Sequence, residues 1–339
     1  MTLLPSLQMF IHSFPIMVLV LAFLMFCQLT CMSQAQLRVG FYSQTCSEAE
    51  SIVRSVVRDA IQTNPRNAPI LLRLHFHDCF VQGCDASVLI DHGFNSERNA
   101  PGHVGLEGFE VIENAKARLE SVCNGTVSCA DIVALAARDA VSLIGVPFYE
   151  VPTGRRDGRV SDISFAANLP EVDDSIRLLK SKFRQKGLSH KDLVLLSSGA
   201  HTIGTTACFF LQKRLYDFTT GNSSDPAINP QFLPKLKALC PPGNVDDRIP
   251  LDAVTESTFD EQIFRNIRDG FAVLSSDARL NDDKNTSQVL ESYINNGSST
   301  GISVPSFKSD FTKAMVKMGY IGVNTGLQGE IRRVCGSFN

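Results

Sequence analysis

Tryptophan is absent from this sequence of 339 residues, and charged residues are absent from its first 35 positions. That uncharged segment contains an apolar run of 12 residues, 16–27, followed by the small residues Ser33 and Ala35. The run is short for a bilayer span, and small residues after it are typical of a signal-peptidase site. We therefore expect residues 1–35 to be a signal peptide that is cleaved after Ala35. A membrane anchor is the alternative, and the lack of a basic N-terminal region does not fit a standard signal.

Residues 36–339 also lack several features. They contain no second apolar run long enough to span a membrane, no low-complexity tract and no internal repeat. A net charge of −3 offers no basic field for nucleic acid. The 304 residues left after cleavage are long for one compact core and short for three domains. We expect a secreted protein without nucleic-acid or membrane partners.

Alternating, strand-like patterns are scarce as well and are confined to short pieces such as residues 148–152. Apolar residues instead recur at helical spacing, and residues 130–141 are strong helix formers. Thr258 and Glu261 have the spacing of a capping box that begins another helix. The patterns predict an all-α fold, mainly helical with about ten helices and minimal β structure.

Connections rich in Gly, Pro and Asp separate the helices, and the central one covers residues 151–170. A boundary near residues 160–170 would divide the chain into two helical halves. We expect the first half to cover about 36–165 together with the C-terminal segment, and the second to cover about 166–310.

Two of the ten cysteines, Cys27 and Cys31, fall in the predicted leader, and eight remain. An even number in an exported chain indicates four disulfides, although counting alone leaves on the order of a hundred connectivities. Four Asn-x-Ser/Thr sequons are compatible with surface glycosylation, and we expect only some of them to be used. They begin at Asn124, Asn222, Asn285 and Asn296.

The segment LLRLHFHDCF at residues 71–80 places a base beside a cation. On a helix, Arg73 and His77 are four residues apart and share a face, Phe76 flanks that face and His75 points elsewhere. Such a pair suits a reaction that moves a proton and stabilises a leaving anion. The alternative is an ordinary amphipathic helix with a histidine whose hydrogen bonds are satisfied.

Hard oxygen donors follow directly. Asp78, Asp85 and Ser87, together with backbone carbonyls, lie within ten residues and suit calcium. Cys79 and Cys84 could close a tight ring around this loop. The alternative is a solvated acidic turn.

A second candidate site surrounds His201 in the segment DLVLLSSGAHTIG at residues 192–204, where the histidine is expected near the end of a helix. A lone histidine in apolar surroundings is more often a packed core residue than a ligand. Asp277 follows in the segment LSSD at residues 274–277. Between them lies another cluster of oxygen donors, Asp252, Thr255, Thr258 and Asp260.

Taken together, five segments carry a family resemblance: RLHFHDC at 73–79, GCDAS at 83–87, VSCADI at 127–132, PTGRRDG at 152–158 and GAHTIG at 199–204. These segments, in this order, resemble the class III plant secretory haem peroxidases. The resemblance covers nearly all of the chain after the leader, from about residue 37 to Cys335.

The resemblance implies one haem b per chain, bound between a distal first half and a proximal second half. His201 would be the axial iron ligand, with Asp277 accepting its other ring N–H. His77 would be the distal base that moves a proton between the two oxygens of peroxide. Arg73 would stabilise the charge that develops on the outer oxygen, and Phe76 would wall off the iron.

The implied reaction reduces hydrogen peroxide to water and oxidises small phenolic or aromatic donors. It proceeds by one-electron steps through an oxyferryl porphyrin-radical intermediate, and donors react at the haem edge. There Pro170 matches the family's donor-contact proline. Lignin precursors, cell-wall tyrosines, auxin and simple peroxide removal under oxidative stress all fit such an edge, so the physiological donor stays open.

Two calcium ions per chain and four disulfides also follow from the resemblance. The distal ion would use Asp78, Val81, Gly83, Asp85 and Ser87, with Glu97 held through water. The proximal ion would use Thr202, Asp252, Thr255, Thr258 and Asp260. The disulfides would be Cys46–Cys123, Cys79–Cys84, Cys129–Cys335 and Cys208–Cys240.

The sequence continues for only four residues after Cys335. We therefore expect no extension of the kind that directs some relatives to the vacuole. We expect secretion to the extracellular space or the cell wall. The habit of the family implies a monomer.

Two positions depart from the family pattern. Tyr149 occupies the place of the usual tryptophan, a change of little consequence for catalysis. His103 stands where the family has the asparagine that orients the distal histidine. A neutral His103 can accept that N–H through one ring nitrogen, but a protonated one cannot, so we expect slower catalysis on acidification near its ordinary pKa of about 6.5. The alternative is that His103 faces solvent and a backbone carbonyl orients His77.

Two other classes of function stay open on the sequence alone. One is a haem-free, disulfide-bonded cell-wall protein that kept the fold, favoured only by His103. The other is a zinc hydrolase built on His75, His77 and Asp78, which is a poor fit because side chains at i and i+2 diverge on a helix. A strong Soret absorption band would distinguish the peroxidase from both.

Overall fold

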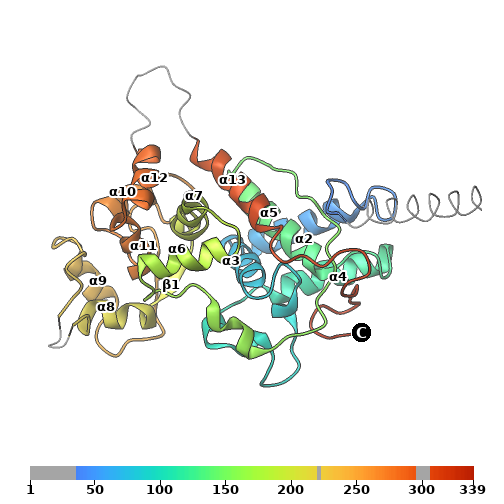
Figure 1. The fold of residues 1–339 in the computed structure, drawn as a ribbon, viewed down its shortest axis with the longest axis horizontal. Helices are drawn as coiled ribbons and strands as arrows, with labels where there is room; N and C mark the ends of the chain where they lie inside the picture. The colour runs from blue at the N-terminus through green and yellow to red at the C-terminus, as the bar shows by residue number, and fades with distance from the viewer. Residues whose placement is uncertain (1–35, 220–222, 295–305) are drawn as a thin grey trace, which may run out of the picture.

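The computed structural model describes residues 36–219, 223–294 and 306–339. The predicted signal peptide, Cys27, Cys31 and the sequons at Asn222 and Asn296 lie outside the described residues. Within the described part of the chain, helices and one pair of short strands form the fold (Figure 1). This architecture confirms the prediction of a mainly helical protein with minimal β structure.

Within the described residues, the α-helices of the first half are α2 (Ala49–Thr63), α3 (Asn67–Phe80), α4 (Phe109–Val122) and α5 (Cys129–Leu143), and short 3-10 turns connect to them. Helix α5 begins where the Ser128 hydroxyl accepts the N–H of Asp131 at 3.1 Å. Its residues from Cys129 to Val141 are all buried, because α2, α3 and α4 pack around it. It is the central helix of this half.

The second half contains shorter elements. Its helices are α6 (Ile176–Gln185), α7 (His190–Val194), α8 (Gln212–Tyr216), α9 (Leu233–Leu239), α10 (Gln262–Arg268), α11 (Ser275–Ala278), α12 (Lys284–Ile294) and α13 (Phe307–Met318). Strands β1 (Thr205–Ala207) and β2 (Arg248–Pro250) pair antiparallel, with Thr206 opposite Ile249. Figure 1 shows α8 to α12 at the opposite end of the molecule from α2 and α4.

Helix α3 joins the two ends because it is buried on two sides. Leu71 and Leu74 belong to the core of α2, α4 and α5, whereas Leu72 and Phe80 belong to the core shared with α6, α7 and α13. The chain after α13 returns to the first half, where Cys335 joins the core (Figure 1). A helix held on both sides is a rigid support for side chains that do chemistry.

The eight cysteines of the described residues form four disulfides, in the pairing that the resemblance implies. They are Cys46–Cys123, Cys79–Cys84, Cys129–Cys335 and Cys208–Cys240. The sequon residues Asn124 and Asn285 are exposed. Among the described residues, none of the helices combines the length and apolar character that crossing a bilayer requires.

Two local predictions are wrong. Residues 148–152 form no strand, and the strands β1 and β2 lie elsewhere. Thr258 and Glu261 form no capping box: Glu261 precedes α10 without a side-chain cap. Instead, Oδ1 of Asp260 accepts the N–H of Gln262 at 2.9 Å, because its carboxylate is closer to the helix start than Thr258.

Candidate active site

Arg73 and His77 lie one turn apart on α3, as their spacing predicts. The Nε of Arg73 donates a hydrogen bond of 3.1 Å to Nε2 of His77. The other two guanidinium nitrogens donate to main-chain carbonyls, at 2.8 Å to Gly105 and at 3.3 Å to Val104. The loop after the 3-10 turn Pro101–His103 therefore fixes the arginine, and the arginine fixes one side of the histidine ring.

The electrostatic environment keeps His77 neutral. Burial, then the positive charge of Arg73 and then the ring of His103 hold the pKa of His77 well below its ordinary value. Burial, followed by the charge of Arg248, lowers the pKa of Arg73 to about 10, so this guanidinium is still charged at neutral pH. A neutral imidazole that accepts through Nε2, beside a fixed cation, combines a base with an anion-stabilising group.

Phe76 completes this face of α3. Its ring stacks on Phe80 with centroids 4.1 Å apart, and it meets the ring of His77 edge-on at 6.0 Å. Phe183 of α6 lies against both phenylalanines. The three aromatic side chains form an apolar wall that limits the access of water to the base.

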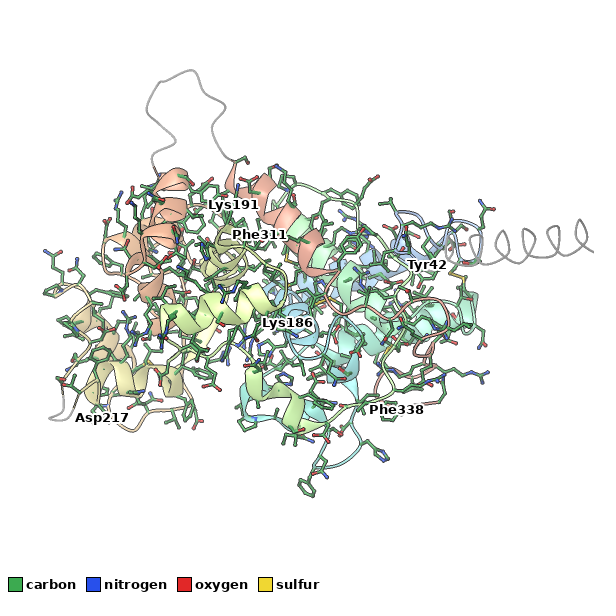
Figure 2. All side chains as sticks on the ribbon, viewed as in Figure 1. Tyr42, Lys186, Lys191, Asp217, Phe311 and Phe338 are labelled. Carbon is green, nitrogen blue, oxygen red and sulfur yellow. A yellow bond between two sulfur atoms is a disulfide. The ribbon has the colours of Figure 1, made fainter. Side chains whose placement is uncertain are left out.

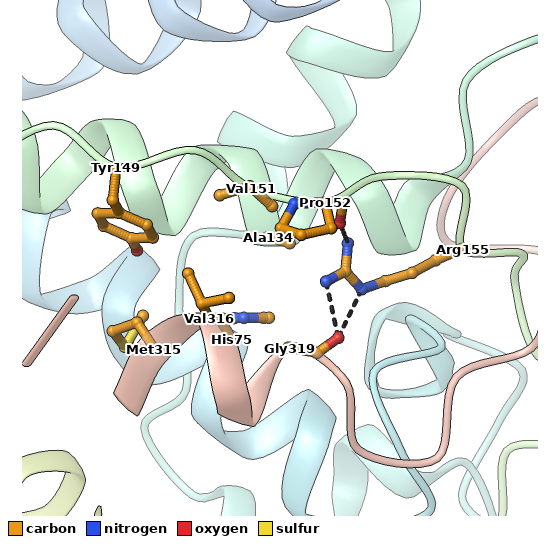
Figure 3. A pocket seen from close by; sticks show the side chains of 9 residues that line it. All are labelled: His75, Ala134, Tyr149, Val151, Pro152, Arg155, Met315, Val316 and Gly319. Carbon is orange, nitrogen blue, oxygen red and sulfur yellow. Dashed lines mark hydrogen bonds between the residues drawn. The ribbon is translucent and has the colours of Figure 1, made fainter. Parts of the chain in front are cut away.

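His75 points away from this face. It is buried, its Nδ1 lies 3.5 Å from Sγ of Cys79, and it borders a cavity of about 10 Å³ lined also by Tyr149 and Arg155 (Figure 3). Such a cavity has room for about one water molecule. Burial, followed by the charge of Arg155, lowers the pKa of His75 to about 3, so the ring is a neutral packing residue.

The zinc site considered from the sequence does not form. His75 and His77 lie on different sides of α3, as the contacts above show. In the described part of the chain, His75, Asp78 and Cys79 do come within metal-ligand distance of one another. The sulfur of Cys79 is bonded to Cys84, however, so it is not a thiolate ligand. The cluster is a buried packing arrangement.

His103 is buried beside His77, with 3% of its surface exposed and ring centroids 5.1 Å apart. The alternative in which it faces solvent is therefore wrong. Neither ring nitrogen of His103 nor Nδ1 of His77 has a hydrogen-bond partner among the described residues. Burial, followed by the charge of Arg73, lowers the pKa of His103 to about 4, which is below the value of about 6.5 assumed from the sequence.

His201 follows a continuous series of turns. Helix α7 leads into the π-helical turn Leu195–Gly199 and then into the 3-10 turn Ala200–Thr202, which carries the histidine. A capping box between Ser189 and Asp192 begins α7. Single π-helical turns are frequent at functional sites, since they redirect a side chain without ending the helix.

Asp277 of α11 holds the ring of His201. Its two carboxylate oxygens lie 2.9 and 3.1 Å from Nδ1, and its side chain is 1% exposed against 29% for the histidine. A carboxylate at Nδ1 places the proton there and leaves a lone pair on Nε2. Histidines that bind a metal through Nε2 are arranged in this way, so the pair fits the iron of a haem.

The distal oxygen cluster, formed by Asp78, Asp85, Ser87 and Glu97, is buried. Several of its oxygens accept no hydrogen bond from the described residues. Oδ1 of Asp85 accepts the N–H of Ser87 at 3.0 Å, and the hydroxyl of Ser87 donates to Oε2 of Glu97 at 2.9 Å. Both carboxylate oxygens of Asp78, and Oε1 of Glu97, have no donor among the described residues. Burial and then the charges of Asp85 and Glu97 raise the pKa of Asp78, and burial raises that of Glu97 to about 8. Buried carboxylates that lack hydrogen bonds and repel one another fit a site for a divalent cation.

The backbone of the same loop is held from outside. Lys186, labelled in Figure 2, follows α6. Its Nζ donates to the carbonyl of Val81 at 2.6 Å. A Cβ at Gly83 would overlap the backbone of Gly322, so only glycine lets the C-terminal segment approach here. A carbonyl has two lone pairs, so that of Val81 can still accept a second partner.

The proximal oxygen donors also come together. The hydroxyl of Thr202 donates to the carbonyls of Thr258 at 3.2 Å and Asp260 at 3.0 Å. The hydroxyl of Thr255 donates to Oδ1 of Asp260 at 3.0 Å, and its N–H donates to Oδ1 of Asp252 at 2.9 Å. All five predicted residues therefore share one cluster next to His201, and both carboxylates accept hydrogen bonds from the protein.

Pro170 follows the 3-10 helix Ile163–Asn168 and is half-buried. The side chain before it, Leu169, would lie 3.0 Å from a Cβ at Gly102, the neighbour of His103. The segment that carries the proline therefore packs against the distal loop.

The sequence did not indicate three contributors to this site. The carbonyls of Val104 and Gly105 hold Arg73, but a backbone carbonyl has no signature in a sequence. Arg248 of β2 acts on Arg73 from more than 170 residues away along the chain, and no local pattern reveals such a contact.

The chain is similar to known plant proteins along most of its length. The Peroxidase family model matches residues 53–296. Peroxidase 43 of Arabidopsis thaliana is 61% identical over 308 residues, covering 91% of this chain and 94% of the relative. Peroxidase 13 of the same plant is 56% identical with the same coverage, and Peroxidase N1 of Nicotiana tabacum is 48% identical over 89% of this chain and 90% of its own. The chain therefore belongs to the peroxidase family and, within it, to the class III plant enzymes, which reduce hydrogen peroxide while oxidising donor molecules.

Proposed function

We propose that this peroxidase holds one haem b between its two halves, with His201 as the axial ligand and His77 as the distal base. The observation that carries the proposal is the bond between Nδ1 of His201 and the buried carboxylate of Asp277 at 2.9 Å. This bond leaves Nε2 as the ligand atom, and a carboxylate partner makes the imidazole a stronger electron donor. When bound, the haem supplies the iron that receives peroxide and the electrons that reduce it.

His77 moves the proton. Its Nε2 carries the lone pair, because it accepts the N–H of Arg73 in the structure. Its pKa, held low by burial and then by Arg73, keeps it unprotonated and ready to accept a proton from peroxide. The imidazolium that forms is a strong acid, so it returns the proton to the leaving oxygen.

Arg73 contributes charge at a fixed position. Its bonds to the carbonyls of Val104 and Gly105 hold the guanidinium beside the base, so little reorganisation accompanies the reaction. Phe76 limits the space next to the base and keeps bulky donors away from it. Donor oxidation is therefore expected at the segment with Pro170, and small phenols are the donor class that we propose.

Two calcium ions complete the proposal. The distal ion would be held by Asp78, Asp85 and Ser87 with the carbonyls of Val81 and Gly83, and by Glu97 through water. The unpartnered carboxylate oxygens of Asp78 support this site. The proximal ion would be held by Thr202, Asp252, Thr255, Thr258 and Asp260, and it would brace His201 through the adjacent Thr202.

We also propose that the chain is secreted to the extracellular space or cell wall after cleavage at Ala35, is glycosylated at exposed sequons and acts as a monomer. The uncharged leader and four disulfides support export. Asn124 and Asn285 are exposed, as glycosylation requires.

The test compares the haem content and turnover of the purified protein with those of two variants. We expect a strong Soret band in the wild type, loss of most haem in His201→Ala, and retention in His190→Ala. His190 is the matched control, because it is an exposed histidine on the helix that leads to His201. Equal haem content in both variants would refute the ligand assignment, and a wild type without a Soret band would favour the haem-free cell-wall protein.

A further inference from the structure

Arg248 is an exposed arginine that is held in place. It is the first residue of β2, opposite Ala207 of β1. Its Nε donates to the hydroxyl of Thr205 at 2.9 Å, and its Nη2 donates to the carbonyl of Thr205 at 3.0 Å. Two bonds to one residue fix the plane of the guanidinium, which an exposed arginine in water would not keep.

The fixed guanidinium is directed toward the distal loop. Its Nη1 lies 3.9 Å from the position that a Cβ on Gly105 would take. The carbonyl of Gly105 accepts a hydrogen bond from the guanidinium of Arg73 at 2.8 Å, so two cations lie near the same residue. After burial, the charge of Arg248 contributes to the lowered pKa of Arg73, as the repulsion of two nearby cations requires.

No carboxylate of the described residues neutralises Arg248. It takes part in no ion pair there, and its Nη1 donates no hydrogen bond there. Glu107 acts on Arg73 through its charge, but this exposed side chain forms no ion pair with either arginine within the described part of the chain. Like charges held together favour an anion between or beside them.

The location decides which anion fits. Strand β1 begins three residues after Thr202, so Arg248 is tied to the segment that carries His201. The same segment touches α3, since a Cβ at Gly204 would lie 2.9 Å from Pro69. Arg248 therefore lies where the proximal hairpin, which follows His201, meets the distal loop that holds Arg73, the hydrogen-bond partner of His77.

We propose that Arg248 binds a carboxylate of the haem at this edge and so ties the cofactor to the β1–β2 hairpin. The inference rests on the proposed haem site and adds a residue that holds the cofactor by its acidic side chains. Nη1 and the second N–H of Nη2 offer the paired donors that a carboxylate accepts, and the bonds to Thr205 reduce the conformational entropy lost on binding.

The experiment compares haem with its dimethyl ester, which lacks the two charged carboxylates. The full-length protein is loaded with either compound, and the rate of cofactor loss to an excess of a haem-scavenging protein is measured. We expect Arg248→Gln to lose haem about three- to tenfold faster than the wild type, in the range of a partly exposed charge-assisted bond. For the ester, wild type and variant should differ by less than about twofold.

Two further variants sharpen this comparison. Arg248→Lys keeps the charge without the paired donors, so it should fall between the wild type and Arg248→Gln. Arg333→Gln removes another exposed arginine, in the C-terminal segment, and should leave both loss rates unchanged.

The possible outcomes distinguish failure of the Arg248 assignment from failure of the proposed haem site. Equal acceleration of haem and ester loss in Arg248→Gln would mean that the residue only supports the fold, and no acceleration of either would also overturn the proposal. A variant that keeps haem normally but shows a raised KM for a phenolic acid, and not for its methyl ester, would assign Arg248 to the donor's carboxylate instead. Failure of the wild type to bind either compound would refute the haem site itself.

Discussion

The two histidines of this peroxidase are held in different ways. On the proximal side, His201 is bonded to buried Asp277, and the next residue, Thr202, is bonded to two carbonyls of the oxygen cluster. On the distal side, His77 is bonded through Nε2 to Arg73, while Nδ1 has no partner among the described residues. The proximal histidine is thus held at its ring by a buried carboxylate and at the next residue by two hydrogen bonds, whereas the hydrogen bond to the ring of the distal histidine comes from Arg73 at Nε2.

The two oxygen clusters also differ in how many hydrogen bonds the protein donates to their carboxylates. In the proximal cluster the carboxylates of Asp252 and Asp260 accept hydrogen bonds from the protein. In the distal cluster Asp78 has two unpartnered oxygens, and the raised pKa values of Asp78 and Glu97 reflect buried, mutually repelling charges. The proximal carboxylates are thus satisfied by the protein itself, whereas the distal carboxylates leave oxygens for the proposed cation, and the distal base is held through a single arginine.

The largest effect is expected from removal of the distal base. His77→Leu should keep the haem, because the ligand is on the other side, and should slow the reaction with peroxide by about 10³- to 10⁴-fold. Stopped-flow measurement of the first spectral change after mixing with peroxide gives this rate. A near-wild-type rate in the variant would contradict proton transfer by His77.

Removal of Arg73 should cost less. Arg73→Leu takes away charge stabilisation but leaves the base, so we expect a loss of about 10²-fold in the same stopped-flow experiment. Arg73→Lys should recover part of the loss, since it restores the charge without the fixed fork. If Arg73→Leu were slower than His77→Leu, the proposed division of labour would be reversed.

The distal cluster should make the calcium-free protein sensitive to pH. The pKa of Glu97 is raised from 4.5 to about 8, so the folded state retains a proton that the unfolded state loses between these values. Its contribution to stability is fully present below pH 4.5 and falls by about 1.4 kcal/mol per pH unit up to about pH 8. Chelator-treated protein should therefore unfold at lower denaturant concentration at pH 8 than at pH 5.

Calcium should remove most of that difference, because the cation favours the ionised carboxylates. Glu97→Gln supplies the control, since it cannot ionise at this position and should reduce the pH dependence of the chelated protein, leaving the part that comes from Asp78. Metal analysis should find about two calcium ions per chain. If the protein is purified without calcium, and if chelator does not change its unfolding at either pH, these carboxylates do not bind a cation.

The smallest effect concerns His103, the departure from the family pattern. With a pKa of about 4, His103 is neutral above that pH and can accept the N–H of His77, and below it the ring is charged and cannot. The reaction with peroxide should therefore slow as the pH falls through about 4, with one ionisation more than His103→Asn shows. The variant should be a few-fold faster at the acid end, about the effect of one hydrogen bond to the base. Superimposable pH–rate profiles would exclude a role of His103 in orienting the base.

The parts of this site that are local in the chain could be predicted from the sequence. Arg73 and His77 share a face because helical periodicity places residues i and i+4 together. The pair of His201 and Asp277 is 76 residues apart, and only the family resemblance indicated it. The capping box predicted at Thr258 is wrong because α10 begins later, after Glu261, where the Asp260 carboxylate accepts the N–H of Gln262. Tertiary packing decides where the helix begins.

The most direct test of the central claim is the iron–histidine stretching frequency of the ferrous protein, measured by resonance Raman spectroscopy. A carboxylate at Nδ1 gives the imidazole anionic character and strengthens its bond to iron. If His201 is the ligand and Asp277 its partner, the band should be absent in His201→Ala and should move to lower frequency in Asp277→Asn. A band that stays at the wild-type frequency in Asp277→Asn, or persists in His201→Ala, would contradict the account.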